Sequence, residues 1–231
     1  MDFSRRSYQK ELLDGNDVPF DAIKQNMKEL DQINRYLGGH AITLAGFKRL
    51  VGKQKMISIC EIGCGGGDNL MAIQHWCSKK NIQLRITGID INPFCIDIAK
   101  EKFNPANAGF LLSDYRLIDF GKEKPNIIFA SLFCHHFTDA ELGEVLAWMR
   151  SNATKGFFIN DLHRHPLAYY SIALLTRLFS RSYLVKNDAP LSVLRGFNRK
   201  EWKKILEESG IKVYFIQWKW AFRWLITINN K

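Results

Sequence analysis

The chain has 231 residues and a mass of 26.7 kDa, a length that favours one large domain over two small ones. Hydrophobic residues make up 46% of it and charged residues 24%, which excludes a disordered chain, a collagen-like chain and a disulfide-stapled mini-protein. Lysine and arginine number 33 against 23 acidic residues. The formal net charge of +10 favours acidic ligands, anionic membranes or nucleic acid without choosing among them.

The cysteines and the N-terminal sequence indicate the cellular compartment in which the protein is expected. The cysteines form no CxxC pair and have no zinc-ligand spacing; they are Cys60, Cys64, Cys77, Cys95 and Cys134. A scattered, odd set is typical of reduced thiols, so we expect a cytoplasmic protein without a metal. The charged N-terminus does not resemble a signal peptide. The longest apolar run, Leu167–Leu175, is far below the roughly 20 residues that span a bilayer.

The first predicted element is an amphipathic helix over Phe20–Leu37. Gly38 and Gly39 follow it and are expected to end it. One face of this helix carries a stripe of apolar side chains: Ile23, Met27, Leu30, Ile33 and Leu37. We expect residues 1–54 to form a helical cover over the domain that follows.

From residue 55 onward, short apolar runs alternate with helical patterns. The predicted strands are Met56–Ile62, Leu84–Asp90, Phe110–Ser113, Asn126–Ser131 and Gly156–Asp161. The predicted helices between them are Asp68–Lys80, Pro93–Phe103 and Asp139–Asn152. This alternation predicts right-handed crossovers and an α/β fold with a doubly wound, mostly parallel sheet.

The last third of the chain departs from that alternation. Residues 162–197 form an insertion that contains a strongly apolar helix pattern over Leu167–Ser180. A short helix follows, beginning at Asn198 with Glu201 as the partner in a capping box. Two runs separated by two residues predict a terminal antiparallel hairpin; they are Ile211–Trp218 and Ala221–Ile228.

A glycine-rich turn, Glu61-Ile62-Gly63-Cys64-Gly65-Gly66-Gly67-Asp68, follows the first predicted strand. Glycines at such a turn let the backbone approach a ligand closely at a helix N-terminus. A dinucleotide fingerprint needs glycine or alanine where this chain has Asp68, whose carboxylate would repel a pyrophosphate. No P-loop pattern is present either. The turn therefore favours a cationic or amine-bearing ligand, and a tight turn without a ligand is the alternative.

Acidic residues end the second and third predicted strands. Asp90 stands where a carboxylate can accept both hydroxyls of a ribose. Asp114 could accept from an adenine amino group, with Tyr115 beside the ring. Each aspartate taken singly is more often a helix cap or a turn former than a cofactor ligand. Together they lie at the carboxyl ends of strands, where open α/β sheets bind ligands.

These residues, over about 55–231, resemble the class I S-adenosylmethionine-dependent methyltransferases. The resemblance implies a Rossmann-like sheet of seven strands, with residues 55–231 as the domain that binds S-adenosyl-L-methionine. It implies that Gly63 and Gly65 line the methionine part of the cofactor and that Asp68 approaches its amino group. It also implies ribose contact by Asp90 and adenine contact by Asp114. The other cofactor-side residues are Glu61, Ile91, Tyr115 and Ser131.

Within that family, the chain is similar to ubiquinone/menaquinone C-methylases and to bacterial methyltransferases associated with type III polyketide synthases. The stretches that carry this narrower resemblance are INRYLGGH, NDLHRHPLAYY and APLSVLRGF. It implies a place in quinone or polyketide biosynthesis, within secondary metabolism.

An acceptor that is a phenol or enol needs a general base within hydrogen-bond reach. Histidine suits this role because its pKa lies near working pH. The candidates follow the fourth and fifth predicted strands and are His163, His165 and His135, with His136 beside the last. For the His135-His136 pair, capping or packing is the alternative. Polar contacts to the acceptor are expected from Arg164, Ser192 and Arg195 in the insertion 162–197, which would form a lid.

The insertion also concentrates positive charge. Between residues 162 and 204 the chain has nine basic and two acidic residues, a net charge of 9 − 2 = +7. Three interpretations beside the lid stay open for its apolar helix: a peripheral contact with an anionic membrane, a docking surface, and an ordinary packed helix with snorkelling arginines.

The favoured function is S-adenosylmethionine-dependent methylation, at oxygen or carbon, of a small hydrophobic aromatic acceptor such as a phenol, quinol or polyketide-derived ring. An RNA methyltransferase is the first alternative, because the sequence pI is about 9.4. Nucleic acid is disfavoured, since no base-pinching Pro-Pro motif follows the fourth strand and no RNA-binding motif is visible. A non-catalytic cofactor-binding subunit of a biosynthetic complex is the second alternative. The oligomeric state is left open.

Overall fold

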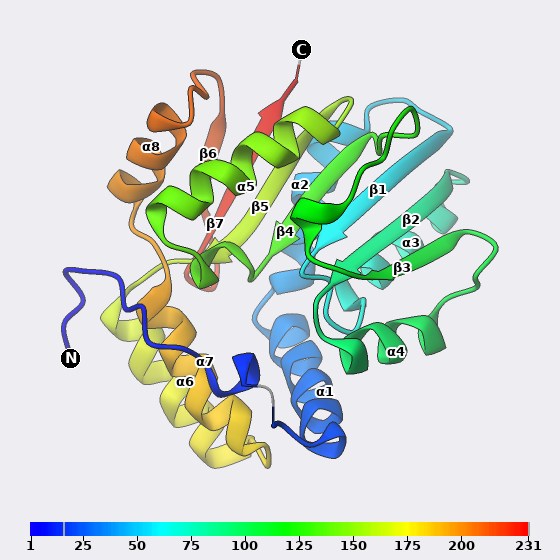
Figure 1. Cartoon of the computed structure of the whole chain (residues 1–231). Helices are drawn as coiled ribbons and strands as arrows, with labels where there is room; N and C mark the ends of the chain where they lie inside the picture. Colours follow the sequence, from blue (N-terminus) through cyan, green and yellow to red (C-terminus); the bar gives the residue numbers. More distant parts are fainter. Residues whose placement is uncertain (16, 231) are drawn as a thin grey trace.

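A seven-stranded sheet forms the centre of the computed structural model, which describes residues 1–15 and 17–230 (Figure 1). The strands are β1 Met56–Ile62, β2 Gln83–Asp90, β3 Ala108–Leu112, β4 Ile127–Ser131, β5 Gly156–Leu162, β6 Phe215–Lys219 and β7 Arg223–Asn229. Their spatial order is β3-β2-β1-β4-β5-β7-β6, with β7 antiparallel to both neighbours. The predicted doubly wound sheet with a terminal antiparallel hairpin is confirmed.

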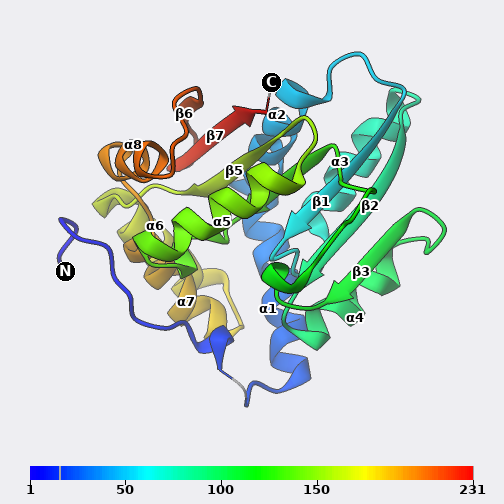
Figure 2. The same cartoon turned by 45° about the horizontal axis from the view of Figure 1, so that its top comes forward.

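Helices cover both faces of the sheet (Figure 2). The helices on one face are α2 Gly39–Val51, α3 Asp68–Lys79 and α4 Pro93–Lys102; those on the other are α5 Asp139–Asn152 and α8 Arg199–Glu208. Two separate apolar cores result, and the strands between them are buried on both sides. This explains why β4 is apolar along nearly its whole length, as is typical of a parallel strand covered on both faces.

Caps visible in the sequence set where several helices begin. The Asn92 side chain accepts from two backbone amides at the start of α4, with Pro93 in the first helical position. Reciprocal capping boxes begin α5, with Thr138 and Glu141, and α8, with Asn198 and Glu201. The predicted box at Asn198 is confirmed.

Most predicted boundaries of helices and strands shift by one or two residues, and the differences are larger around α1, α7 and the terminal hairpin. The first long helix, α1 Phe20–Tyr36, ends as predicted, but Gly38 adopts a left-handed conformation (φ 78°) that turns the chain directly into α2. The helix α7 Tyr183–Arg195 was not predicted, because it contains Pro190. The hairpin strands span Phe215–Lys219 and Arg223–Asn229 instead of Ile211–Trp218 and Ala221–Ile228, with a three-residue turn between them.

Three helices lie together beyond the carboxyl ends of the parallel strands: α1, α7 and α6 Pro166–Phe179 (Figure 1). The predicted insertion 162–197 is thus mainly the helical pair α6–α7. Glu29 of α1 fixes the turn of this pair, because its buried carboxylate accepts from the backbone amides of Arg181 (2.9 Å) and Ser182 (3.2 Å). The pair is therefore anchored at its far end as well as at the sheet.

The N-terminal segment 1–15 lies against α7 and the rim of the sheet (Figure 1). Arg6 is buried and donates to Asp139 and to backbone carbonyls, including that of Phe137. Asp188 of α7 accepts from the backbone amides of Leu12 and Leu13, in a 3₁₀ turn over Leu12–Asp14. These contacts join residues more than a hundred positions apart in the chain.

All five cysteines are buried free thiols. Among the described residues, every helix is too short or too polar to cross a bilayer.

We expect Gly46→Ala to lower the free energy of unfolding by about 1–3 kcal/mol. A β-carbon at Gly46 would lie 2.5 Å from the ring of Phe158, because α2 packs closely on β5. Gly143→Ala in α5 is the matched control: the nearest atom to its added carbon is the Ser209 hydroxyl, at 3.8 Å, and we expect no loss of stability. Urea unfolding measures both changes. Equal losses for the two variants would contradict this packing of α2.

Candidate functional site

A cavity of about 770 Å³ lies at the carboxyl ends of the strands. The glycine turn and the ends of β2 and β4 form one side of it, while α1, α7 and the N-terminal segment form the other. This is the edge at which open α/β sheets bind ligands. Most of the predicted cofactor and acceptor residues line this one cavity, and three do not.

The glycine turn has a shape that side chains would disturb. Gly63 and Gly65 both have positive φ, 65° and 50°. A β-carbon at Gly63 would come within 2.3 Å of the Phe133 ring, which follows β4. The amide of Gly65 donates to the Asp90 carboxylate over 2.8 Å. The turn is therefore locked between the ends of β2 and β4, with its backbone on the cavity wall.

Asp90 is held by the backbone at the end of β2. Its second carboxylate oxygen accepts from the amide of Asn92 over 2.9 Å. Burial raises the pKa of Asp90, and these backbone donors act in the opposite direction. Each carboxylate oxygen has further lone-pair capacity and Asp90 lines the cavity, so the carboxylate can still accept from ribose hydroxyls. Ile91 is 75% exposed at the rim beside it.

Two polar atoms at the wall of the cavity are buried and have no partner among the described residues. They are Oε2 of Glu61 and Nδ2 of Asn26. The other carboxylate oxygen of Glu61 accepts from Asn69 over 3.0 Å, and burial raises the pKa of Glu61 well above its usual range. An acceptor and a donor left unsatisfied suit a ligand with an ammonium and a carboxylate group. The cavity thus fits the amino-acid part of S-adenosylmethionine.

Two predicted cofactor residues already have partners of their own. Asp68 forms an ion pair with Lys102 (2.6 Å), and Asp114 forms one with Arg116 (2.5 Å). The Arg116 guanidinium lowers the pKa of Asp114, whereas burial raises that of Asp68 despite its lysine. Both carboxylates line the cavity, but each already pairs with a cation of the protein, which reduces the negative charge available to a ligand.

Tyr115 and Ser131 complete the predicted cofactor side. The ring of Tyr115 packs edge-on against Trp148, with 5.3 Å between centroids, so most of it belongs to the core. Ser131 is 8% exposed at the end of β4, and its hydroxyl accepts from Asn160 over 3.2 Å. Both residues still reach the cavity wall.

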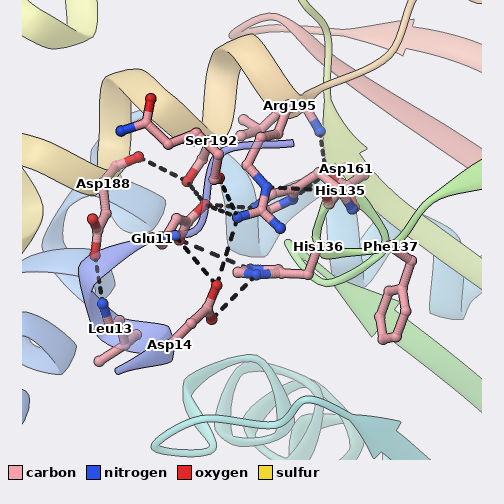
Figure 3. Close-up of polar contacts among 12 residues, drawn as sticks. Glu11, Leu13, Asp14, His135, His136, Phe137, Asp161, Asp188, Ser192 and Arg195 are labelled. Atoms are coloured by element: carbon pink, nitrogen blue, oxygen red, sulfur yellow. Dashed lines mark hydrogen bonds and ion pairs between the residues drawn. The ribbon is translucent and has the colours of Figure 1, made fainter. Parts of the chain in front are cut away.

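His135 is buried between two carboxylates (Figure 3). Its Nδ1 lies 2.8 Å from Asp161 of β5, and its Nε2 lies 3.4 Å from Glu11 of the N-terminal segment. Burial acts to lower the pKa of His135, but the two carboxylates outweigh it and raise the pKa to about 9. The imidazole is therefore protonated at neutral pH and cannot accept a proton there.

A second layer of charged groups surrounds this histidine (Figure 3). His136 lies 3.4 Å from Asp14 and 3.9 Å from Glu11, with its ring partly open to the cavity. The hydroxyl of Ser192 is 2.6 Å from Glu11, and Arg195 is 3.5 Å from Asp14. Ser192 and Arg195 both line the cavity, and both contact the N-terminal segment.

The ligand-type atoms of Glu11, His135 and His136 lie within 4.8 Å of one another, a spacing that metal sites also have. The surrounding chemistry does not fit a divalent cation. The guanidinium of Arg195 stands 4.0 Å from the Glu11 carboxylate, and His135 carries its own positive charge. These three residues therefore form an ion-pair network in which the protein supplies its own cations.

Three predicted acceptor-side residues lie away from the cavity wall. His163 accepts from the indole of Trp218 over 3.2 Å, and burial lowers its pKa to about 4. His165 caps α6, and its ring stacks on Phe222. Arg164 is buried in an ion pair with Glu201 (2.6 Å). The chain turns outward after β5, toward the β6–β7 hairpin, so these three side chains do not line the cavity.

The sequence analysis missed Glu11, Asp14 and Asn26, which line the cavity from the first part of the chain. One local signal was available: Glu11 and Asp14 have the three-residue spacing of a capping box, which the structure forms at the start of the 3₁₀ turn. No local pattern indicates that this turn packs against the His135-His136 pair.

Comparisons with known proteins agree with this geometry. Residues 59–156 match the family model described as a methyltransferase domain. The structure of the plantazolicin methyltransferase BpumL in complex with SAH aligns with a TM-score of 0.69 and 18% identity, over 94% of this chain and 92% of that one. No curated protein matches the sequence.

Two further solved structures have the same fold. One is magnesium protoporphyrin IX methyltransferase (ChlM) from Synechocystis PCC 6803 with bound SAM, with a TM-score of 0.59 and 14% identity over 94% of this chain and 93% of that one. The other is human N-acetylserotonin methyltransferase in complex with SAM, with a TM-score of 0.62 and 17% identity over 91% of this chain and 56% of that one. With the methyltransferase-domain match over residues 59–156 and the Rossmann-like sheet, the chain contains a methyltransferase domain and has the fold of the class I S-adenosylmethionine-dependent methyltransferases.

Proposed function

We propose that this enzyme methylates a small hydrophobic aromatic acceptor, such as a phenol, quinol or polyketide-derived ring. The observation that carries the proposal is that one cavity joins the glycine turn to an apolar wall. That wall is formed by Leu13, Val18, Ile23, Met27, Leu30 and Val185. The structural neighbours support a small acceptor, since they are named for plantazolicin, magnesium protoporphyrin IX and N-acetylserotonin. Quinone or polyketide metabolism would supply such rings.

The cofactor would lie along the sheet side of the cavity. When bound, S-adenosylmethionine supplies an electrophilic methyl group. We assign the ribose hydroxyls to Asp90, because its carboxylate is fixed by two backbone amides. We assign the methionine ammonium to Glu61, because one of its buried oxygens lacks a partner. This revises the expectation for Asp68, which Lys102 already neutralises.

His136 is the residue best placed to take a proton from the acceptor. Its ring lines the cavity, with Nδ1 3.4 Å from Asp14 and Nε2 3.9 Å from Glu11. His135, in contrast, is protonated and buried, so it positions Glu11 instead of acting as the base. Proton removal by a positioned side chain contributes typically 10²–10⁴-fold to rate.

Residues 1–54 and the insertion 162–197 would act together as the cover of the acceptor site. α1 and α7 line the cavity, and the N-terminal segment closes it between them (Figure 1). Because Glu29 anchors the turn of the α6–α7 pair to α1, we infer that acceptors enter by displacement of residues 1–15, not by movement of the helical pair.

Mass spectrometry of metabolites from cells with and without the gene tests the acceptor class. We expect a hydrophobic aromatic compound to gain 14 mass units in the presence of the active enzyme. His136→Gln should lower its formation by about 10²–10⁴-fold if this residue removes a proton. His75→Gln on the exposed surface of α3 is the control and should leave formation unchanged. Methylation found only on RNA would contradict the proposal.

Asp90→Ala should weaken binding of S-adenosylmethionine by about 1–3 kcal/mol, roughly 5- to 150-fold, because the ribose hydroxyls and the Gly65 amide lose their acceptor. Asp97→Ala, on the exposed side of α4, should bind as the wild type does. Isothermal titration calorimetry measures both affinities. An unchanged affinity in the Asp90 variant would remove this carboxylate from the ribose site.

The His135 ion pairs should make stability depend on pH. The pKa of about 9 in the folded protein is above the usual 6.5, so their contribution is complete below pH 6.5 and disappears as pH rises through 9. We therefore expect the difference in melting temperature between wild type and His135→Gln to be largest near pH 6 and to shrink toward pH 9. The His75→Gln variant should show no such trend. A difference that stays constant from pH 6 to 9 would contradict a charged His135.

A further inference from the structure

The outward face of α6 is apolar and exposed. Its large side chains are between 40% and 78% exposed: Leu167, Tyr170, Leu174, Leu175, Leu178 and Phe179. Leu167, Tyr170, Leu174 and Leu178 follow at three- and four-residue steps and so share one side of the helix, with Leu175 and Phe179 flanking them. Ala168 and Ile172 of the same helix are buried and pack into the protein. We call these six residues the outer α6 face. Large apolar side chains left exposed together on a helix whose other residues already pack into the protein indicate a second apolar environment outside the protein.

Exposed aromatic residues lie on the elements around this face. Tyr183 begins α7, Tyr36 ends α1, and Trp220 lies in the β6–β7 turn; they are 54%, 83% and 68% exposed. The end of α1 and the turn pack with α6 through Leu37 and Phe222. Tyrosine and tryptophan are enriched where a protein meets the headgroup region of a bilayer.

Positive charge accompanies the apolar surface. The sequence contains no aspartate or glutamate between residues 162 and 187. Arg177, Arg181 and Lys186 are exposed, and none of them forms an ion pair within the described part of the chain. A helix that is apolar on one side with free cations beside it is the type of surface that binds anionic lipid.

We propose that the outer α6 face binds the surface of an anionic lipid bilayer, with α6 lying in the plane of the headgroups. The apolar side chains would enter the boundary between headgroups and acyl chains, and Arg177, Arg181 and Lys186 would contact lipid phosphates. The charge favours a bilayer over a second copy of this chain, because pairing two such faces would bring their like charges together.

This inference goes beyond the proposed function and does not depend on which acceptor is methylated. The two helices of the pair contribute to different surfaces. Val185 and Ser192 of α7 line the cavity, whereas the apolar residues of the outer α6 face are exposed on the outside of the protein. Membrane contact would therefore leave the cavity lining intact and bring the cover close to membrane-dissolved compounds.

Co-sedimentation of the full chain with lipid vesicles tests the proposal. We expect at least tenfold tighter binding to vesicles containing phosphatidylglycerol than to pure phosphatidylcholine vesicles, and weaker binding as salt rises. The variant Arg177→Glu with Arg181→Glu should lose about tenfold or more of the binding to the anionic vesicles.

The variant Leu174→Glu with Leu178→Glu should lose binding to both kinds of vesicle. The matched control is Met56→Glu with Val213→Glu, two exposed apolar residues at other places on the surface, 59% and 81% exposed. Circular dichroism and calorimetry with S-adenosylmethionine show whether each variant is folded.

Three results would overturn the proposal: no binding of the wild type to anionic vesicles at low salt, equal losses in the control and outer-face variants, or a wild-type dimer that the outer-face variant alone converts to monomer. The last would make the face a self-association surface.

Discussion

The protonated imidazole of His135, between Asp161 and Glu11, is the interaction on which the cavity depends. Asp161 is the second-last residue of β5, so it belongs to the sheet, whereas Glu11 comes from an N-terminal segment without regular structure beyond one short turn. Removing one member of a buried ionic group leaves an uncompensated charge, which costs about 3–5 kcal/mol. The sheet and the N-terminal segment are therefore coupled through His135. While His135 is charged, its ion pair with Glu11 holds this segment in place as the outer wall of the cavity.

The cavity combines two kinds of support. The sheet side is fixed by backbone geometry, because parallel strands bring the glycine turn and the ends of β2 and β4 to one edge. The cover side is held by side-chain contacts between distant parts of the chain, such as Ser192 with Glu11 and Arg195 with Asp14. This division suits a methyltransferase, since the structural neighbours are bound to SAM or SAH but are named for different acceptors.

The sequence predicted the sheet side well and the cover side poorly, for a physical reason. β1 runs from Met56 to Ile62 as predicted, since a lysine-rich loop and the glycine turn delimit a short apolar run. Asp90 and Asp114 lie at the same edge of the sheet because β2 and β3 run parallel, so their positions follow from strand direction alone. His163 also follows its strand as predicted, but the path of the chain after β5 depends on packing against Trp218, which is 55 residues later. Contacts between residues so far apart in the chain produce no periodic pattern in the sequence.

The distribution of charge also bears on which anionic partner suits this protein, a lipid bilayer or RNA. Eight carboxylate side chains line the cavity, against three from lysine and arginine, counted over the part of the chain that the structure describes. A phosphate backbone entering this site would meet net negative charge, so the excess of +10 does not form an RNA-binding active site. The cations gather elsewhere, and some of the exposed ones flank the apolar side of α6. Basic charge outside and acidic charge inside suit an enzyme that approaches an anionic surface while its active site receives a neutral or cationic small molecule.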